Sequence, residues 1–267
     1  MTAPSALVDV EREGAALVVT MNRPERRNAV DRGLADALSA ALDMLDDDES
    51  LWCGVLTGGQ SYFSAGSDLT AGGDYVTERG GEYGIIRRRR RKPLIAAVEG
   101  FALGGGMEIV LACDLVVASR TARFGLPEVG IGVIPTCAGL FRAPRSLPLN
   151  VARELILTGD MFPARRAYEH GLVNRVVPRE LLQQNIPIEC CRIAFHIGAL
   201  NTSFAPAEHK KRIQKRCQLS CAPVKSPFPS FNYIHSILVM VWHMSQEVVA
   251  KSRQVAGHRR NSAGHAL

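Results

Sequence analysis

The sequence has no long apolar run. The longest near its end, Ile237 to Trp242, is far shorter than the roughly 20 residues that a helix needs to cross a bilayer. The first residues, MTAPSALVDVEREG, have no apolar stretch after a basic start, so we expect no secretory signal. These absences argue against an exported protein and against contact with a membrane, and we expect a cytoplasmic one.

Several catalytic motifs are missing as well. The chain contains no G-x-x-x-x-G-K-[ST], no G-x-G-x-x-G between a strand and a helix, no G-x-S-x-G and no H-E-x-x-H. Nucleotide hydrolysis, dinucleotide redox chemistry and serine hydrolysis therefore lose their usual signatures. The seven cysteines, an odd number, do not form a disulfide framework and favour reduced thiols. The spacing Cys217 to Cys221 matches no zinc motif, so we expect no metal.

Charge is divided unevenly along the 267 residues. Residues 1–182 have a net charge of −2, whereas residues 183–267 have +8, six of the seven histidines and no aspartate. We therefore predict a core over 1–182 and a C-terminal segment of atypical composition over 183–267, for which a helical structure is one interpretation. Our hypothesis is that this segment is a distinct module or a tail created by a frameshift or a splice junction near residue 183.

Short apolar segments alternate with helical patterns in the first part of the chain. Leucines three or four residues apart follow Asp31, which is a plausible N-cap, and predict a helix that ends before the acidic run 46–49. A further helix is expected from Asn150 to Leu157. Buried strands are expected over 15–21, 52–57, 94–98 and 115–118. This alternation predicts an α/β domain with a helix-covered sheet.

The stretch from Thr70 to Lys92 has no periodicity, and we expect a mobile loop that leads to a short helix. Its arginine run, 87–91, allows three interpretations: a solvated helix face, an electrostatic patch for phosphates, or a nucleic-acid contact. No interleaved aromatic residues or RNA motif accompany the run, which makes nucleic acid the weakest of the three.

Two glycine-rich turns and two glutamates are the candidates for chemistry. The segment 104–108, GGGME, follows an expected strand, and its glycines can expose the first N–H groups of a helix to a developing negative charge. Tight helix–strand packing is the alternative explanation. The segment 63–69, FSAGSDL, could add a second N–H donor. Glu108 and Glu128 could then divide acid and base duties, although a single glutamate is usually a surface residue.

In their order and spacing, these elements resemble the crotonase, or enoyl-CoA hydratase/isomerase, superfamily over about residues 5–182. The matching pieces are NRP and NA at 22–29, FSAGSDL, KPLIAAVEGFALGGGMEIVLACDLVVAS, ARFGLPEVGIGVIP, and LTGD followed by GLVNRVV. The resemblance implies a crotonase-type spiral of ββα units. It also implies an acyl-CoA thioester as substrate, no cofactor beyond the coenzyme A of that substrate, and a homotrimer or hexamer.

The resemblance also implies roles for individual residues. The backbone N–H groups of Ser67 and Gly105 are expected to form the oxyanion hole for the thioester oxygen. Glu108 is expected to hold and activate water, and Glu128 to deliver a proton to C2. The expected substrate-binding residues are Ala65, Asp68, Leu69 and Arg26. Two glutamates in these positions favour a lyase that adds water reversibly to a 2-enoyl-CoA.

One segment departs from the family pattern. Where hydratases usually continue with G-A-G-G, residues 136–139 read TCAG, and residues 140–142 read LFR in place of the common TQR. The β-carbons of Thr136 and Ala138 lie where they could narrow the pocket or shift the water. An enoyl-CoA isomerase, a dehydratase for a specialised acyl group, and a catalytically silent CoA- or RNA-binding homologue therefore remain as alternatives.

Overall fold

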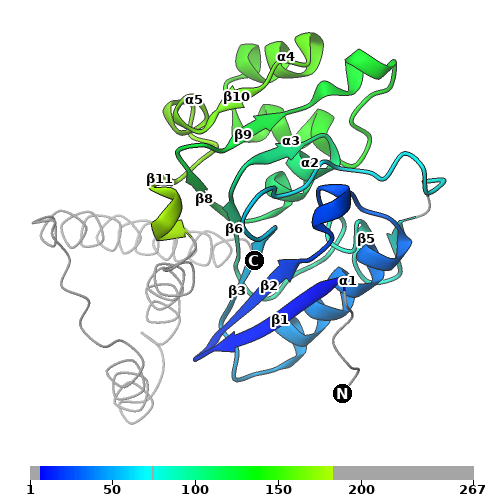
Figure 1. The fold of residues 1–267 in the computed structure, drawn as a ribbon, viewed down its shortest axis with the longest axis vertical. Helices are drawn as coiled ribbons and strands as arrows, with labels where there is room; N and C mark the ends of the chain where they lie inside the picture. The colour runs from blue at the N-terminus through cyan, green and yellow to red at the C-terminus, as the bar shows by residue number, and fades with distance from the viewer. Residues whose placement is uncertain (1–6, 74, 183–267) are drawn as a thin grey trace, which may run out of the picture. The chain divides into compact units, whose positions relative to one another are not determined.

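The computed structural model describes residues 7–73 and 75–182. Its largest element is a six-stranded sheet in the order β1-β2-β3-β6-β8-β11, in which β1 is antiparallel to β2 and every other neighbouring pair is parallel (Figure 1). The strands are β1 (Val8–Glu13), β2 (Ala16–Met21), β3 (Cys53–Thr57), β6 (Leu94–Val98), β8 (Leu115–Ser119) and β11 (Arg175–Val177). Four of them confirm the strands expected from apolar runs, and the mixed α/β class is confirmed. The predicted segment 183–267 lies outside the described residues.

A second sheet gives the chain its repeated ββα organisation. After β6 in the large sheet, the chain adds β7 to the small sheet and then forms α2, and after β8 it adds β9 and then forms η2 and α3. The small sheet consists of β7 (Phe101–Leu103), β9 (Arg123–Gly125) and β10 (Phe162–Pro163), and a hairpin pairs β4 (Val76–Thr77) with β5 (Gly81–Glu82). The helices are η1 (Pro24–Arg26), α1 (Arg32–Asp47), α2 (Gly105–Ala112), η2 (Pro127–Ile131), α3 (Gly139–Ser146), α4 (Leu149–Thr158) and α5 (Ala164–Glu169).

Helix α1 begins and packs as its sequence predicts. The Asp31 side chain accepts a hydrogen bond of 2.9 Å from the backbone N–H of Leu34, which satisfies one of the free donors at the helix start. Leu34, Leu38 and Leu42 are fully buried on one face, and the helix contacts β1, β2 and β3 (Figure 1).

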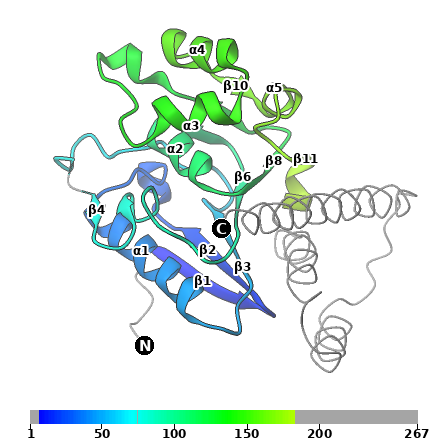
Figure 2. The same cartoon turned by 180° about the vertical axis from the view of Figure 1, so that it is seen from behind.

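Helix α2 lies in the interior of the described region. All eight of its residues are buried, including Glu108, and the helix packs against α3 and β7 (Figure 2). Because a helix surrounded by protein must be apolar on every side, the single carboxyl group on it is exceptional. A buried carboxyl group in such a helix is a candidate for function.

Three local predictions were wrong. Helix α4 begins one residue before Asn150, with Pro148 rather than Asn150 at its N-cap. The stretch 70–92 contains no helix in its described part and instead forms the β4–β5 hairpin and turns that bury Tyr83 and Ile85. Asp46 is not in a solvated turn but in the last turn of α1, where it is buried.

The reason for both of the last two errors is Arg88. Its side chain is 1% exposed and its guanidinium contacts Asp43 at 2.6 Å and Asp46 at 3.4 Å. It also donates to the carbonyl and hydroxyl oxygens of Ser39, at 2.9 Å each. Two aspartates and two further acceptors thus compensate a charge that would otherwise be costly to bury.

The other arginines of the run are used differently. Arg90 forms an ion pair of 2.8 Å with Asp114, and Arg87 pairs with Glu82, whereas Arg89 is exposed. The residues 87–91 are not helical, so the interpretation as a solvated helix face is wrong. Arg88 is too deeply buried to contact phosphates, so the interpretation of this residue as part of a coenzyme A patch is wrong too.

We expect Arg88→Ala to destabilise the fold by about 3–5 kcal/mol, because it leaves two aspartates beside an uncompensated buried site. Arg89→Ala, at the neighbouring exposed position, should change the free energy of unfolding by less than about 0.5 kcal/mol. Urea denaturation of the two variants beside the wild type measures both values. Equal stabilities for the two variants would contradict the structural role of Arg88.

Candidate active site

The loop 63–69 is held in place by Asn28. The Asn28 side-chain amide donates hydrogen bonds of 2.9 Å to the carbonyl oxygens of Gly58 and Tyr62, and the Ser64 hydroxyl donates to the Asn28 carbonyl oxygen at 2.7 Å. Asn28 itself is buried and has a positive φ of 53°, a conformation that asparagine tolerates better than most residues. The loop is therefore fixed from its outer side by a side chain far away in the sequence.

Gly66 brings this loop into backbone contact with the start of α2. A β-carbon placed on Gly66 would lie 2.6 Å from the backbone nitrogen of Gly105 and 2.9 Å from the carbonyl oxygen of Leu103. The φ angle of Gly66 is +94°, which a residue with a side chain adopts only at a cost. Only glycine fits at position 66. Because it has no side chain, the backbone next to Ser67 can lie directly against the backbone of Gly105, the other predicted oxyanion-hole residue.

The two backbone N–H groups in question are not used within the fold. The bridge to Val30 uses the carbonyl oxygen of Gly66 and the N–H of Asp68, which skips Ser67. Gly105 is the first residue of α2, whose opening N–H groups have no partner in the helix. Within residues 7–73 and 75–182, no hydrogen bond engages either N–H group. Both are free to donate to one oxygen atom, at the positive end of a helix dipole.

Glu108 lies one turn into α2 and faces the start of α3. It is 2% exposed, and its Oε1 accepts a hydrogen bond of 2.8 Å from the backbone N–H of Gly139. Burial raises the pKa of Glu108 to about 7, with a further contribution from the negative charge of Glu128 and against the opposing effect of the Gly139 N–H. The carboxyl group thus changes its protonation state close to neutral pH.

Glu128, in η2, completes the pair. A β-carbon on Gly104 would lie 3.3 Å from Oε1 of Glu128, so this carboxyl group adjoins the glycine turn at the start of α2. Its Oε2 is buried without a hydrogen-bond partner, and burial raises the pKa of the group. Two carboxyl groups that repel one another and are both desolvated retain a proton at a pH where free glutamates have lost theirs.

Two residues near these groups were not found from the sequence. The hydroxyl groups of Ser67 and Tyr83 are 2.8 Å apart. Burial is the main cause that raises the pKa of the Tyr83 hydroxyl, and the Cys137 thiol lies close enough to contribute. Burial raises the pKa of the Cys137 thiol. Tyr83 lies in the stretch that we expected to be mobile, and no motif marks it. Cys137 was noted only as a departure from the family pattern.

The expected substrate-binding residues lie around this centre in different ways. Ala65 is exposed, and its N–H group donates a hydrogen bond of 3.0 Å to the carbonyl oxygen of Arg27. The neighbouring Arg26, on η1, is exposed as well. Leu69 is 76% exposed. Asp68 is different, because its carboxylate accepts hydrogen bonds from Thr70 and pairs with Arg23 at 2.8 Å.

These contacts hold the pKa of Asp68 at about 2, and they give its side chain a role in fixing the loop. Contact of these four residues with a substrate stays a prediction.

The segment 136–139, which departs from the family pattern, contacts Glu108. Gly139 donates its backbone N–H group to Oε1 of Glu108 at 2.8 Å, and Cys137 lies close enough to affect the pKa of that carboxyl group. Ala138, between them, has a φ of 84°, a left-handed conformation that its β-carbon disfavours. The glycine usual in the family would relieve this strain, so the departure at residue 138 has a measurable structural cost.

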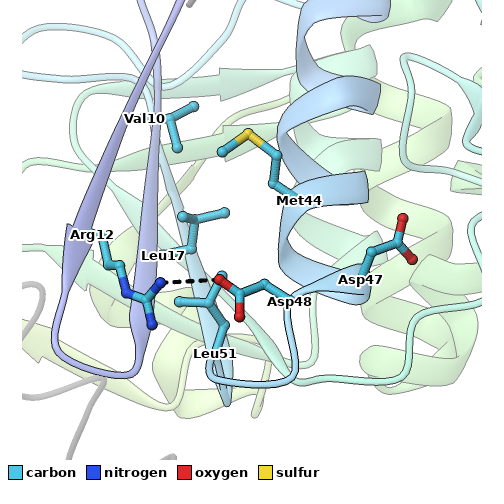
Figure 3. A pocket seen from close by; sticks show the side chains of 7 residues that line it. All are labelled: Val10, Arg12, Leu17, Met44, Asp47, Asp48 and Leu51. Carbon is cyan, nitrogen blue, oxygen red and sulfur yellow. Dashed lines mark hydrogen bonds and ion pairs between the residues drawn. The ribbon is translucent and has the colours of Figure 1, made fainter. Parts of the chain in front are cut away.

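Two of the hollows in the described region are lined by neither Glu108 nor Glu128. One, of about 410 Å³, lies between the β1–β2 hairpin and the end of α1, where Arg12 and Asp48 form an ion pair of 3.0 Å (Figure 3). The other, of about 250 Å³, is lined by residues of α2 and β8 together with Gly171. Among the described residues, no group of three or more His, Cys, Asp or Glu side chains could hold a metal ion. None of the helices described is both long and apolar enough to cross a membrane.

Comparison with known proteins gives a consistent result. A family model described as enoyl-CoA hydratase/isomerase matches residues 11–216. A probable enoyl-CoA hydratase of Rhizobium meliloti is 43% identical over 183 residues, which cover 66% of this chain and 70% of the relative. A short-chain-enoyl-CoA hydratase of Clostridium acetobutylicum is 40% identical over 184 residues, with the same two coverages. The crystal structure of a probable enoyl-CoA hydratase/isomerase from Mycobacterium abscessus superposes with a TM-score of 0.67 at 38% identity, covering 80% of this chain and 88% of the other.

The pKa of Glu108 predicts a pH dependence of stability. The folded protein holds this proton up to about pH 7, whereas an ordinary glutamate loses it near 4.5. Between these pH values the native state therefore binds more protons than the unfolded state. The contribution of Glu108 to the free energy of unfolding is fully present below about pH 4.5 and is lost as the pH rises to about 7. Across that interval, Glu108→Gln should gain stability relative to the wild type by an amount on the order of 3 kcal/mol.

Denaturant unfolding at several pH values between 4.5 and 7.5 measures this difference. Glu49→Gln, at an exposed position, is the control for the removal of a charge. A difference between wild type and Glu108→Gln that stays constant with pH would show that the carboxyl group does not titrate in this range.

Proposed function

The chain belongs to the enoyl-CoA hydratase/isomerase family, and from that premise we propose that it is a hydro-lyase that adds water reversibly to a 2-enoyl-CoA thioester. One observation carries the proposal: the buried carboxyl group of Glu108 and the half-buried one of Glu128, both with raised pKa, lie near two backbone N–H groups that no described residue engages. This arrangement can polarise a carbonyl group and move two protons beside it.

In the proposed mechanism, the thioester oxygen accepts hydrogen bonds from the N–H groups of Ser67 and Gly105. Electron density moves toward this oxygen, so that C3 becomes electrophilic. Glu108 removes a proton from the water that attacks C3, and Glu128 delivers a proton to C2. The product gains O–H at C3 and hydrogen at C2 on the same face, and a proton returned from Glu108 to Glu128 restores the enzyme.

The environments of the two carboxyl groups support this division of roles. Glu108 accepts an N–H from Gly139, which favours its ionised form and fixes its orientation. Among the described residues Oε2 of Glu128 has no hydrogen-bond partner, and it is buried, a setting that favours a protonated oxygen until a substrate carbon takes the proton. Because water is added without oxidation or reduction, the reaction requires no cofactor beyond the coenzyme A of the substrate.

We assign the acyl-CoA contacts to the surface of the same loops. Ala65 and Leu69 are exposed on either side of the Ser67 turn, and Arg26 is exposed on the turn bonded to Ala65. Exposed apolar side chains next to an arginine suit a ligand with an apolar acyl chain and a phosphate-bearing carrier. Asp68 contributes to this set by holding the loop through Arg23.

A dehydratase for a specialised acyl group is the second candidate. It is favoured by the β-carbons at Thr136 and Ala138, in the segment whose Gly139 N–H group holds Glu108. With these β-carbons, less space is left for an acyl chain or a water molecule than with glycine at the same positions. The chemistry would be the same reaction run toward the enoyl-CoA.

A homotrimer, or a hexamer of two trimers, is also part of the proposal. Large apolar side chains are exposed within a short stretch of η2, the following loop and α3, namely Val129, Ile131, Val133, Ile134, Leu140 and Phe141. An apolar patch of this kind commonly marks a protein–protein contact. We place the protein in the cytoplasm, since its seven cysteines, an odd number, favour reduced thiols.

Crotonyl-CoA is the first substrate to test, by the loss of its enoyl-thioester absorbance. We expect turnover by the wild type and a fall in kcat of about 10²–10⁴-fold in both Glu108→Gln and Glu128→Gln, because each loses one proton-transfer group. Calorimetric binding of a saturated acyl-CoA should persist in both variants. Wild-type activity that survives in both variants would refute the two-glutamate mechanism.

Light scattering coupled to gel filtration tests the assembly. We expect a mass of three or six chains for the wild type and a lower mass for Ile134→Ser, which places a polar group in the apolar patch. Val76→Ser, at an exposed apolar position on β4, is the control. A monomeric wild type would overturn the proposed assembly.

A further inference from the structure

Tyr83 has a backbone conformation that its side chain disfavours. Its φ is +54°, in the left-handed region, although it carries a large aromatic side chain and is 2% exposed. The backbone is fixed there by a hydrogen bond of 2.9 Å from the Tyr83 N–H to the Tyr75 carbonyl oxygen, and the two tyrosine rings pack with their centres 4.7 Å apart. Strained residues of this kind persist where the surrounding structure requires one side-chain position.

This backbone conformation places the Tyr83 side chain between Gly105 and Ser67, the two residues proposed to form the oxyanion hole. A β-carbon on Gly105 would lie 2.6 Å from Cζ of Tyr83, so the phenol ring fills the space directly against this glycine. On its other side, the Tyr83 hydroxyl is 2.8 Å from the hydroxyl of Ser67. One residue therefore contacts the backbone unit of the first donor and the side chain of the second.

We propose that Tyr83 is a positioning residue that fixes the separation of the Ser67 and Gly105 N–H groups through its hydrogen bond to the Ser67 hydroxyl. This inference rests on the proposed function and assigns a role to the Ser67 side chain, which the backbone role of Ser67 does not require.

The physical reason is the short range over which such donors act. An N–H group stabilises a developing oxyanion only when it lies at hydrogen-bond distance from the position that the charge will occupy. Backbone hydrogen bonds hold Phe63 and Ser64 to β7, the strand that leads into α2, but they end three residues before Ser67. The Tyr83–Ser67 hydrogen bond extends this attachment to Ser67 itself. Its loss should weaken transition-state binding more than ground-state binding.

The test compares Tyr83→Phe, Ser67→Ala and the double variant in crotonyl-CoA hydration. Phenylalanine keeps the ring against Gly105 and removes only the hydroxyl. We expect each single variant to lower kcat about tenfold, as for the loss of one hydrogen bond, with KM within about twofold. The double variant should lose no more than either single one, because both remove the same interaction.

A spectroscopic measurement reports the donors directly. In the wild type, the carbonyl stretch of bound butyryl-CoA, labelled with carbon-13, should fall to lower frequency than in water. Tyr83→Phe and Ser67→Ala should each reduce that shift. Tyr75→Phe removes a hydroxyl from the adjoining ring and should leave both kcat and the frequency unchanged.

Wild-type kcat and an unchanged carbonyl frequency in Tyr83→Phe would overturn the proposal, as would additive losses in the double variant. If Tyr83→Phe does not fold, Ser67→Ala, at a half-buried position, decides the question by the same two measurements. A wild type that binds butyryl-CoA but does not hydrate crotonyl-CoA refutes the proposed function, and the carbonyl frequency still decides the role of Tyr83.

Discussion

The contact between Gly66 and the start of α2 is the constraint on which the site depends. Two loops separated by some 40 residues approach so closely that a single β-carbon at residue 66 would collide with the Gly105 nitrogen. Backbone contact at this distance is possible because Asn28 holds one loop and the small sheet holds the other. The two N–H groups, the two carboxyl groups and Tyr83 all take their relative positions from this approach.

The fold buries charge in two ways, with different consequences. Arg88 is enclosed by acceptors and two aspartates, so that its charge is compensated and its role is structural. Glu108 is buried as deeply but forms no ion pair with any described residue, and burial, with a smaller contribution from Glu128, raises its pKa to about 7. The difference between a compensated and an uncompensated buried charge separates a residue that stabilises from one that can exchange a proton.

The sequence predicted those features that depend on residues close together in the chain and missed those that depend on residues far apart. The strand 94–98 and the Asp31 cap follow from neighbouring residues, and Glu108 and Glu128 lie in motifs of fixed spacing. Asp46 and Tyr83 could not be placed, since Asp46 is buried by an arginine 42 positions later and Tyr83 by glycines and a serine in other loops. Ala138 lies between these cases, because the motif marked it as unusual, but only its φ of 84° shows what the substitution costs.

The donors assigned to the oxyanion hole belong to the main chain, and this separates two properties that often evolve together. Side chains on the surrounding loops, such as Leu69 and Thr136, can be replaced without removing either N–H group. Substitutions at such positions can therefore change which acyl groups bind while the two N–H groups that polarise the carbonyl group are retained. In the proposed mechanism the main chain polarises the carbonyl group, Glu108 and Glu128 transfer the protons, and the outer side chains determine the selectivity.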